Sequence, residues 1–358
     1  MKSLICLYDN NVESLSKRNA SLSLVLVCYN QKDLIVQSIS SIIDQMIEGD
    51  EIVIIDDCSN DQCAMVAEIY LRSVQVACRV RLFTKNANKG VNHTFNLIPS
   101  VAVHSNIVAL AGDDFYYPNA IDHIRGLINS NPNYSAIFSS CNVVDMRGKI
   151  IGISNYSDDF LPYSIYQLSA TGSSNVEGHS LVCWNTKILN LYGGLTDDVS
   201  NEDDQLILRC TLLGGICISH VPIRAYRKSD GSMSSPNVNF SQSIDSYMHG
   251  LVKPLKNRIA NYKANTEFLS NNRGSEGISR IDVNKLISNY SACIECLNTT
   301  IRLIEKRDIF SRVSVLLKYL LKCGFCSSIY YKQNFVIAIS HRLFFYLKKK
   351  RYYNKFSV

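Results

Sequence analysis

The sequence lacks any uninterrupted apolar run of about eighteen residues, which argues against a membrane-spanning helix. Near its start there is no basic segment followed by an apolar core and a small-residue cleavage site, so we expect no secretory signal. The glycine-rich G-x-x-x-x-G-K-[ST] loop that cradles phosphates is missing, and no convincing G-x-G-x-x-G follows the first strand-like run. A nucleotide bound by this chain would therefore need another way to neutralise its diphosphate.

The composition is that of a well-filled globular protein, because 46% of the 358 residues are hydrophobic and only 19% are charged. The thirteen cysteines show no framework spacing, so we interpret them as reduced thiols packed as small hydrophobic side chains. Two C-x-x-C pairs, Cys293/Cys296 and Cys323/Cys326, could together mimic a zinc site. The first pair lies in a helical stretch, whereas structural zinc is usually held by tight turns, and this disfavours zinc.

The charge is distributed unevenly along the chain. Residues Arg302–Val358 carry thirteen Lys and Arg against two acids, a balance of +11 that leaves −5 for the rest of the chain. This tail also interleaves aromatic and aliphatic residues with its basic ones, a mixture that favours an anionic membrane surface as partner. A nucleic acid is the rival polyanion, but no nucleic-acid-binding motif is present, so we expect none. A solvated basic helix face is the alternative without a partner.

The first half of the chain alternates between strand-like and helix-like patterns, which predicts a mostly parallel sheet with right-handed crossovers. The predicted strands are Leu22–Tyr29, Glu51–Ile55, Val80–Thr84, Asn106–Ala111 and Ser135–Ser139. The predicted helices are Asp33–Met46, Asp61–Arg72, Val91–Val103 and Pro118–Ser130. Farther along we expect a hairpin turning at Arg147-Gly148, a helix at Asp203–Leu213 and a strand at Ile216–His220.

A polar, glycine-containing stretch between Ser229 and Ser241 indicates a loop and a domain boundary. Beyond it, apolar residues at three- and four-residue steps predict an almost entirely helical region. We therefore expect an N-terminal extension over residues 1–20, an α/β domain over 21–236 and a helical region with a basic aromatic tail over 237–358.

Two predicted strands end in acidic pairs, Asp56-Asp57 and Asp113-Asp114. Ligands of open α/β sheets bind at the carboxyl ends of strands, so both pairs should face one site. Asp113 and Asp114 offer the oxygen ligands that Mg²⁺ or Mn²⁺ uses to bridge a protein and substrate phosphates. Asp57, at the neighbouring strand end, can accept a hydrogen bond from a base or a ribose. Each pair alone could equally be a helix cap or a solvated turn.

A third acidic cluster, Glu202-Asp203-Asp204, opens a predicted helix. Capping by the helix dipole explains such a cluster without any function. A carboxylate there could instead act as general base and deprotonate an attacking hydroxyl. Shortly afterwards Tyr226-Arg227-Lys228 precedes a Ser/Gly-rich loop, whose cations could close over a diphosphate leaving group.

With these residues assembled, the chain resembles family 2 of the inverting glycosyltransferases with the GT-A fold, over about residues 22 to 234. The anchors are weak singly and strong in this order and spacing. They are Val27–Asn30, Ile55–Ser59, Asn88–Gly90 with Asn96, Leu110–Asp114 followed by Pro118, Gly193–Leu195, Glu202-Asp203 with Leu206 and Arg209, and Tyr226-Arg227.

The resemblance implies a role for each matching residue. Tyr29 and Asp57 would contact the nucleoside, which is expected to be uridine, and Lys89 would lie near the base or the phosphates. Asp113 and Asp114 would bind ribose and a Mn²⁺ or Mg²⁺ ion. Asp203 would be the catalytic base, and Glu202 beside it would orient the base or contact the acceptor. Arg227 would face the diphosphate. Ala111 replaces the first Asp of the family's D-x-D element, and Ser229 replaces a common His after Tyr-Arg.

These features predict a metal-dependent transfer of a hexose or N-acetylhexosamine from a nucleoside-diphosphate sugar. The expected acceptor is a lipid-diphosphate-linked oligosaccharide at the inner face of the cytoplasmic membrane, in O-antigen or capsule assembly. A non-catalytic nucleotide-sugar-binding protein of the same fold is the main alternative. A scaffolding module with a vestigial α/β part is another, and a nucleotidyltransferase is disfavoured because the first strand lacks a glycine-rich basic loop.

Overall fold

A computed structural model of the chain describes residues 3–12, 21–154, 180–197, 199, 202–228, 252–275, 278 and 281–305. The chain divides into two compact units. Unit 1 holds Met1–Asp230 together with Asn271–Ile281, and unit 2 holds Gly231–Ser270 together with Asp282–Val358. The division after Asp230 lies inside the stretch that the sequence predicts as a loop and domain boundary.

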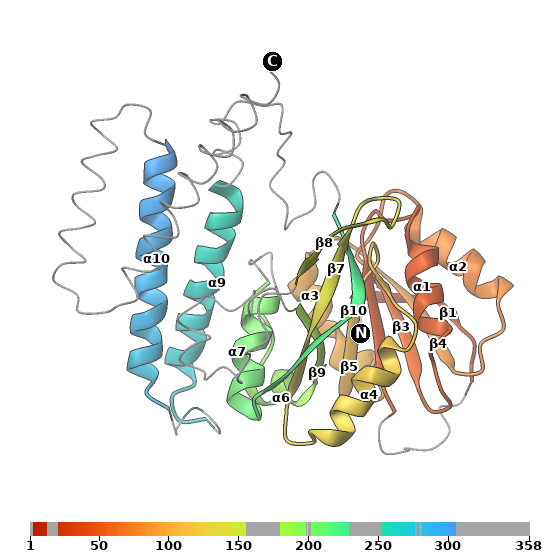
Figure 1. The fold of residues 1–358 in the computed structure, drawn as a ribbon, viewed down its shortest axis with the longest axis horizontal. Coiled ribbons are helices and arrows are strands. Elements are labelled where there is room, and N and C mark those ends of the chain that lie inside the picture. Colours follow the sequence, from red (N-terminus) through yellow and green to blue (C-terminus); the bar gives the residue numbers. More distant parts are fainter. Residues whose placement is uncertain are drawn as a thin grey trace, which may run out of the picture. The chain divides into compact units, whose positions relative to one another are not determined.

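Unit 1 is built on a ten-stranded sheet of order β1-β4-β3-β2-β5-β9-β7-β10-β6, with β8 paired to β7 (Figure 1). Strands β4, β3, β2 and β5 are mutually parallel, as are β7 and β10, whereas β9 runs antiparallel between β5 and β7. The strands are β1 (Leu4–Asp9), β2 (Ser23–Cys28), β3 (Glu51–Asp56), β4 (Arg79–Lys85), β5 (Asn106–Ala111), β6 (Phe115–Tyr116), β7 (Ala136–Val144), β8 (Ile150–Ser154), β9 (Ser180–Asn185) and β10 (Ile216–Arg227).

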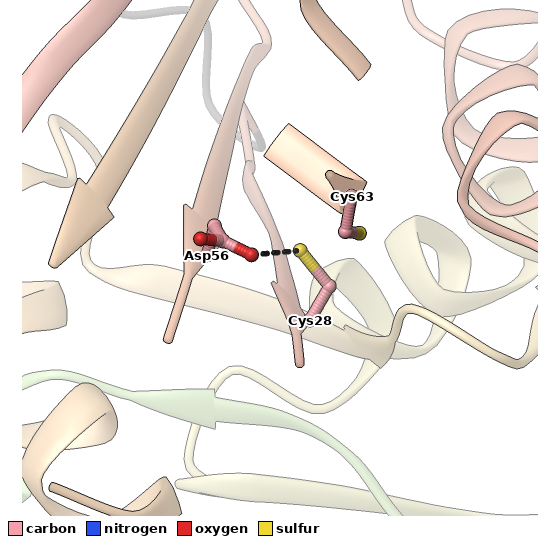
Figure 2. A group of neighbouring side chains, drawn as sticks. All are labelled: Cys28, Asp56 and Cys63. Atoms are coloured by element: carbon pink, nitrogen blue, oxygen red, sulfur yellow. Dashed lines mark hydrogen bonds between the residues drawn. The ribbon is translucent and has the colours of Figure 1, made fainter. Parts of the chain in front are cut away.

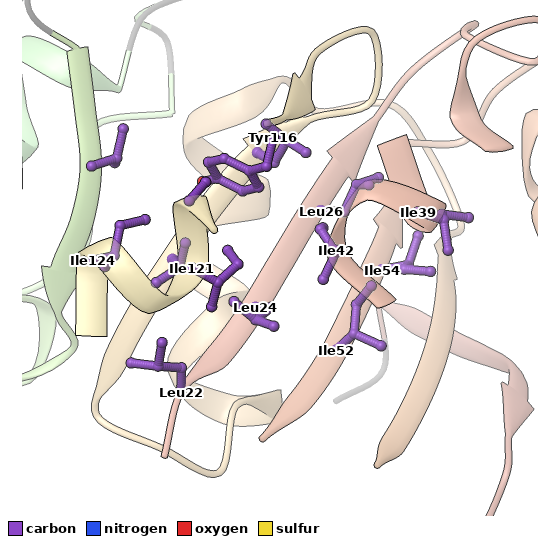
Figure 3. Packing of buried hydrophobic residues seen from close by; sticks show 14 of the residues in the cluster. Leu22, Leu24, Leu26, Ile39, Ile42, Ile52, Ile54, Tyr116, Ile121 and Ile124 are labelled. Carbon is purple, nitrogen blue, oxygen red and sulfur yellow. The ribbon is translucent and has the colours of Figure 1, made fainter. Parts of the chain in front are cut away.

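The helices of unit 1 cover the sheet. They are α1 (Ile35–Ile43), α2 (Cys63–Ser73), α3 (Val91–Val101), α4 (Ala120–Ser130), α6 (Lys187–Tyr192) and α7 (Asp203–Leu213). Leu22, just before β2, and the alternate β2 residues Leu24 and Leu26 pack with Ile39 and Ile42 of α1 in a core that also takes in α4, as Figure 3 shows. Val25, Val53 and Ile55, which point to the opposite face of the strands, are also fully buried, so the central strands are covered on both faces.

The predicted α/β architecture is confirmed, and most predicted elements lie within a few residues of the observed ones. The carboxylate of Asp61, the first residue of the second predicted helix, accepts the N–H of Cys63, the first residue of α2, at 2.9 Å. The predicted turn is present, because the N–H of Gly148 bonds to the carbonyl of Asp145 at 3.0 Å. Four short elements were not predicted: β1, β6, β9 and α6. The strand predicted at Ile216–His220 continues to Arg227.

Unit 2 contributes two described helices, α9 (Val252–Asn271) and α10 (Val283–Glu305). The region is helical where it is described, as the sequence predicts. Cys293 and Cys296 are buried on α10, and neither forms a disulfide within the described residues. The other C-x-x-C pair and the basic aromatic tail lie outside the described residues. Within the described part of the chain, no helix combines the length and the hydropathy needed to cross a bilayer.

Candidate active site

The carboxyl ends of β2, β3 and β5 bring the two acidic pairs to one edge of the sheet. The N–H of Asp57 bonds to the carbonyl of Cys28 at 2.9 Å, and the N–H of Gly112 bonds to the carbonyl of Val27 at 2.9 Å. The loops that follow β3 and β5 are therefore both fastened to the end of β2. This parallel pairing is the reason that residues more than fifty positions apart in the chain lie on the same edge.

Asp57 is buried and is held by the last residue of β4, Lys85, and by Lys89 in the loop that follows it. The ammonium of Lys85 lies 2.5 Å from Asp57 Oδ1, and the N–H of Lys89 donates to the same oxygen at 3.3 Å. Lys85 and Lys89 also line a cavity of about 350 Å³, together with Ser3, Asn86, Ala87 and His93. Burial, and then the nearby charge of Lys85, lower the pKa of His93. Lys89, which the sequence predicts near the base or the phosphates, thus lies beside Asp57. Lys85 was not predicted from the sequence.

Asp113 and Asp114 differ in exposure and in partners. Asp114 is only 3% exposed and its Oδ1 accepts the main-chain N–H of Arg227 at 2.8 Å. Burial raises the pKa of Asp114 to about 7 and also raises the pKa of the half-buried Asp113. Two carboxylates that are costly to ionise unaided are suited to a hard divalent cation that takes its remaining ligands from substrate phosphates and water. The donor set therefore fits Mg²⁺ or Mn²⁺.

The hydrogen-bond donors of Arg227 are almost all bonded to other groups of the protein. Its guanidinium donates to the carbonyl oxygens of Asp113 (2.7 Å), Asp145 (3.2 Å) and Met146 (2.8 Å) and to Gln37 Oε1 (2.7 Å). Its carbon Cζ lies 5.5 Å from the centre of the Phe115 ring, and the residue is 2% exposed. Four of its five N–H donors are thus bonded within the described residues. This geometry makes Arg227 a strut that positions the acidic loop, and leaves at most one donor for a diphosphate.

Glu202 and Asp203 sit at the start of α7, where the helix dipole favours negative charge. Glu202 makes no side-chain capping hydrogen bond, which weakens the purely structural explanation of this cluster. Burial is the main cause that raises the pKa of Asp203, and burial together with the charge of Asp203 raises that of Glu202. A carboxylate whose pKa is raised toward neutrality is a better general base than an ordinary one.

A cation inside the sheet connects these carboxylates. Arg224 of β10 stands in register with Tyr116 of β6 and with Cys141 of β7. Burial raises the pKa values of Asp114 and Asp203, and the positive charge of Arg224 opposes the rise at both. Its Nε is buried without a hydrogen-bond partner among the described residues. Sequence reasoning missed Arg224, because a single arginine within a strand pattern carries no signal of its neighbours.

The start of α7 is positioned by the loop that precedes it. The Asn96 amide donates to the carbonyl of Leu195 at 2.8 Å and accepts its N–H at 2.6 Å. Gln205 Oε1 accepts the N–H of Thr196 at 2.9 Å, and Arg209 donates to the carbonyl of Gly194 at 3.1 Å. A Cβ at Gly194 would lie 3.1 Å from the Asn96 side chain. Helices α3 and α7 therefore grip this loop between them, which gives several of the sequence anchors a structural reason.

Beneath the edge, Cys28, Asp56 and Cys63 form a buried cluster whose potential ligand atoms lie within 4.8 Å of one another (Figure 2). Asp56 Oδ2 accepts the N–H of Ser59 and the hydroxyl of Thr84, both at 3.0 Å, and Oδ1 accepts the Ser59 hydroxyl and the Cys28 thiol. The carboxylate is saturated by these donors, so it fixes the loop after β3. Hydrogen bonding to Cys63 and burial raise the pKa of Cys28. The cluster is part of the buried core, which agrees with the interpretation of the cysteines as packed thiols.

The described cavity adjoins Asp57 through Lys85 and Lys89, and neither Asp114 nor Asp203 lines it. Those two carboxylates instead share an electrostatic interaction with the guanidinium of Arg224. Tyr29, at the end of β2, is 41% exposed and so is available to a ligand. The structure places Asp57, Asp113 and Asp114 just after parallel strands of one sheet, and it links Asp203, at the start of α7, to Asp114 through the charge of Arg224.

Comparison with known proteins relates part of the chain to a protein family. Residues 23–180 match the family described as Glycosyl transferase family 2. An "Uncharacterized glycosyltransferase" of Haemophilus influenzae is 21% identical over 257 residues, which cover 69% of this chain and 82% of that protein. The "Putative glycosyltransferase EpsE" of Bacillus subtilis is 24% identical over 127 residues, which cover 36% of this chain and 45% of that protein. The second alignment thus spans less than half of that relative.

Among solved structures, residues 1–349 of S. aureus TarS in complex with UDP-GlcNAc have a TM-score of 0.50 and 15% identity, covering 84% of this chain and 92% of that one. At this identity the likeness bears on the fold. It agrees with the predicted GT-A architecture and with the mostly parallel sheet described above. Residues 23–180 of the chain therefore match glycosyl transferase family 2, and the fold of the unit agrees with the GT-A architecture.

Proposed function

We propose that the chain transfers a hexose or N-acetylhexosamine from a nucleoside-diphosphate sugar to a sugar hydroxyl, with inversion at the anomeric carbon. The observation that supports this proposal is that Asp57, Asp113 and Asp114 follow parallel strands of the unit that matches family 2, with Arg224 acting on both Asp114 and Asp203. The donors named with structural relatives are nucleotide sugars, UDP-GlcNAc in the case of TarS. Because the acidic groups differ in burial and in partners, each is suited to a different step.

In this mechanism Asp57 and the exposed Tyr29 hold the nucleoside, and Asp113 and Asp114 hold a Mg²⁺ or Mn²⁺ ion. When bound, such an ion neutralises the diphosphate as it leaves. Asp203 accepts the proton of the acceptor hydroxyl, whose oxygen attacks the anomeric carbon from the face opposite the diphosphate. Glu202 lies beside Asp203 to orient the acceptor. Arg227 supports the chemistry by holding the main chain of Asp113 and the side chain of Asp114 in place.

The decisive experiment is a transfer and donor-hydrolysis screen against several nucleotide sugars, with Mn²⁺, with Mg²⁺ and with chelator. Asp203→Asn should abolish turnover and leave donor binding nearly intact, because the amide keeps the shape of the carboxylate but cannot act as a base. Asp122→Asn, at an exposed position on α4, is the matched control. Full turnover in Asp203→Asn would remove Asp203 from the role. Tight nucleotide binding without turnover under any acceptor would favour the non-catalytic alternative.

We further propose that the acceptor is a lipid-diphosphate-linked oligosaccharide, as used in O-antigen or capsule assembly, met at the cytoplasmic face of a membrane. The support is the composition of the tail, which mixes Lys and Arg with Phe, Tyr and Leu. Deleting residues 342–358 should release the protein from vesicles that contain anionic lipid. Unchanged co-sedimentation of the truncated chain would contradict this assignment.

A further inference from the structure

The hairpin of β7 and β8 presents apolar and basic side chains together at residues 146–151, its tip. Three apolar side chains are more than half exposed there, Met146 (51%), Ile150 (51%) and Ile151 (57%). The two basic side chains among them are exposed as well. Single apolar side chains on a protein surface are ordinary, whereas a group of them indicates contact with another surface. The proposed mechanism gives this group no task.

The hairpin tip has a fixed shape because Asp145 organises its main chain. The Asp145 carboxylate accepts the N–H groups of Arg147 and Lys149, both at 2.9 Å. The Asp145 main chain bonds to that of Gly148 at 3.0 Å and to that of Lys149 at 2.9 Å. Gly148 adopts a φ of 81°, which suits a glycine at the turn. The one acidic side chain of the turn is thus directed to the turn itself, and the charges that the tip exposes are positive.

The hairpin tip is joined to the acidic loop that carries the proposed metal ligands. The Arg227 guanidinium donates to the carbonyl of Met146 at 2.8 Å and to that of Asp113 at 2.7 Å. At the turn, a Cβ on Gly148 would lie 3.9 Å from the ring of Phe115, which follows the acidic pair. A surface that binds the tip is therefore held next to the acidic loop.

We propose that the hairpin tip docks the protein on an anionic lipid surface. Its apolar side chains enter the boundary between headgroups and acyl chains, and Arg147 and Lys149 meet lipid phosphates. Lys228 adds an exposed cation beside the hairpin, because its N–H bonds to the carbonyl of Val144 at 2.9 Å. A lipid surface suits this set, since it accepts apolar side chains without a matching pocket and supplies a phosphate to each cation. A nucleic acid would supply the phosphates but no apolar layer.

This inference rests on the proposed function, in which the acceptor is carried by a lipid, and adds to it a membrane contact within unit 1. The contact is separate from the basic aromatic tail. Weak membrane contacts commonly act in pairs, because one alone gives only marginal and reversible binding. Tip and tail together therefore hold the protein where neither suffices. A lipid-borne acceptor on the same surface meets the acidic loop without leaving the membrane.

The test is co-sedimentation of the full chain with vesicles of phosphatidylcholine, with and without about one third phosphatidylglycerol. Ile150→Ser combined with Ile151→Ser, the double-serine variant, should weaken binding to anionic vesicles at least about tenfold, because it removes two apolar side chains that leave water on docking. Arg147→Gln combined with Lys149→Gln should weaken binding to anionic vesicles about tenfold and binding to neutral vesicles little, because only anionic lipid attracts the two charges.

The matched control is Met65→Ser combined with Ile69→Ser on α2, where the side chains are 48% and 61% exposed. It should leave vesicle binding unchanged. A fluorescence measurement separates the tip from the tail. Trp184 is the only tryptophan of the chain and is 1% exposed, so it is shielded from lipid. In Ile151→Trp the introduced indole should be quenched by brominated lipid, and in Ile69→Trp it should not.

Unchanged sedimentation of the double-serine variant would overturn the docking of the hairpin tip. An unquenched indole in Ile151→Trp, on vesicles that bind the chain, would also overturn it and assign the tip to another partner. Absence of binding to either vesicle would overturn it together with the proposed lipid-linked acceptor. Donor hydrolysis should be unchanged in the double-serine variant. Absence of hydrolysis and transfer in the unmodified chain, with vesicle binding intact, would overturn the proposed function and leave the docking standing.

Discussion

The main-chain N–H of Arg227 donates a 2.8 Å hydrogen bond to Oδ1 of Asp114, which lies 113 residues earlier in the chain. The last residue of β10 thereby fixes the carboxylate that follows β5. The Arg227 guanidinium then returns to the carbonyl of Asp113, so the acidic loop is held on two sides. This relationship places Arg227 behind the site as a support, rather than over it as a closing loop residue.

Arg227→Met should therefore lower stability as well as activity. The change removes four hydrogen bonds from a guanidinium that is 2% exposed, and we expect a loss of about 2–4 kcal/mol in the free energy of unfolding. Urea denaturation measures it. Lys228→Met is the matched control, because the next side chain is exposed and its removal should cost little. An equally small loss in both variants would show that Arg227 faces a ligand instead.

Most of the fold could be predicted because burial leaves a pattern in the sequence. The run Ile52–Ile55 is buried on both faces, so its residues are apolar without alternation, as expected for a central parallel strand. The missed elements depend on distant partners. Strand β9 fits antiparallel between β5 and β7, and β1 lies at the edge of the sheet, where its partner among the described strands, β4, follows about seventy to eighty residues later. Two-residue β6 is too short for any periodicity.

The candidate site was predictable where an acidic pair follows an apolar strand and not where a cation belongs to a strand that carries several charges. Asp57 and Asp114 follow apolar runs, and this position alone assigns them to the ligand edge. Lys85 and Arg224 belong to strands β4 and β10, which carry other arginines, so neither cation stands out in the sequence. Only the register between strands, with Asp56 opposite Thr84, reveals that Lys85 reaches Asp57. Both strands were predicted from the sequence, but the register between them was not.

Removing the charge of Arg224 should move the acid limb of the pH–rate profile. Burial raises the pKa of Asp203, and the positive charge of Arg224 opposes that rise. In Arg224→Met the pKa of Asp203 should rise further, so the base is protonated over a wider range and the limb moves to higher pH. We expect kcat/KM to fall roughly tenfold more at about pH 6 than at about pH 8. Arg72→Met, in an exposed pair with Glu68, should leave the profile in place. An unshifted limb in Arg224→Met would contradict the coupling.

Binding of Mn²⁺ should strengthen with pH, because a carboxylate must lose its proton to bind a metal. The pKa of Asp114 is raised by burial to about 7, so a large fraction of this carboxyl is protonated at slightly acidic pH. Between about pH 6 and pH 8 we expect the dissociation constant to fall by roughly tenfold. Titration calorimetry in two buffers of different ionisation enthalpy would detect the released proton. Asp114→Asn should abolish the pH dependence, and a flat affinity in the unmodified chain would mean that Asp114 is not a ligand.

The clamp on the loop before α7 should affect turnover more than donor binding. Asn96→Ala removes both amide hydrogen bonds to the main chain of Leu195, at 2.6 and 2.8 Å, and with them the link between α3 and the loop that leads to Asp203. We expect kcat to fall about tenfold, because a base displaced by a fraction of an ångström loses much of its effect. The dissociation constant for the donor nucleotide should change less than about threefold, since Asp57 and Lys85 belong to other elements and keep their contacts. Asn190→Ala, on the exposed side of α6, is the matched control and should change neither quantity. Equal losses in kcat and in donor affinity would indicate general unfolding rather than displacement of the base.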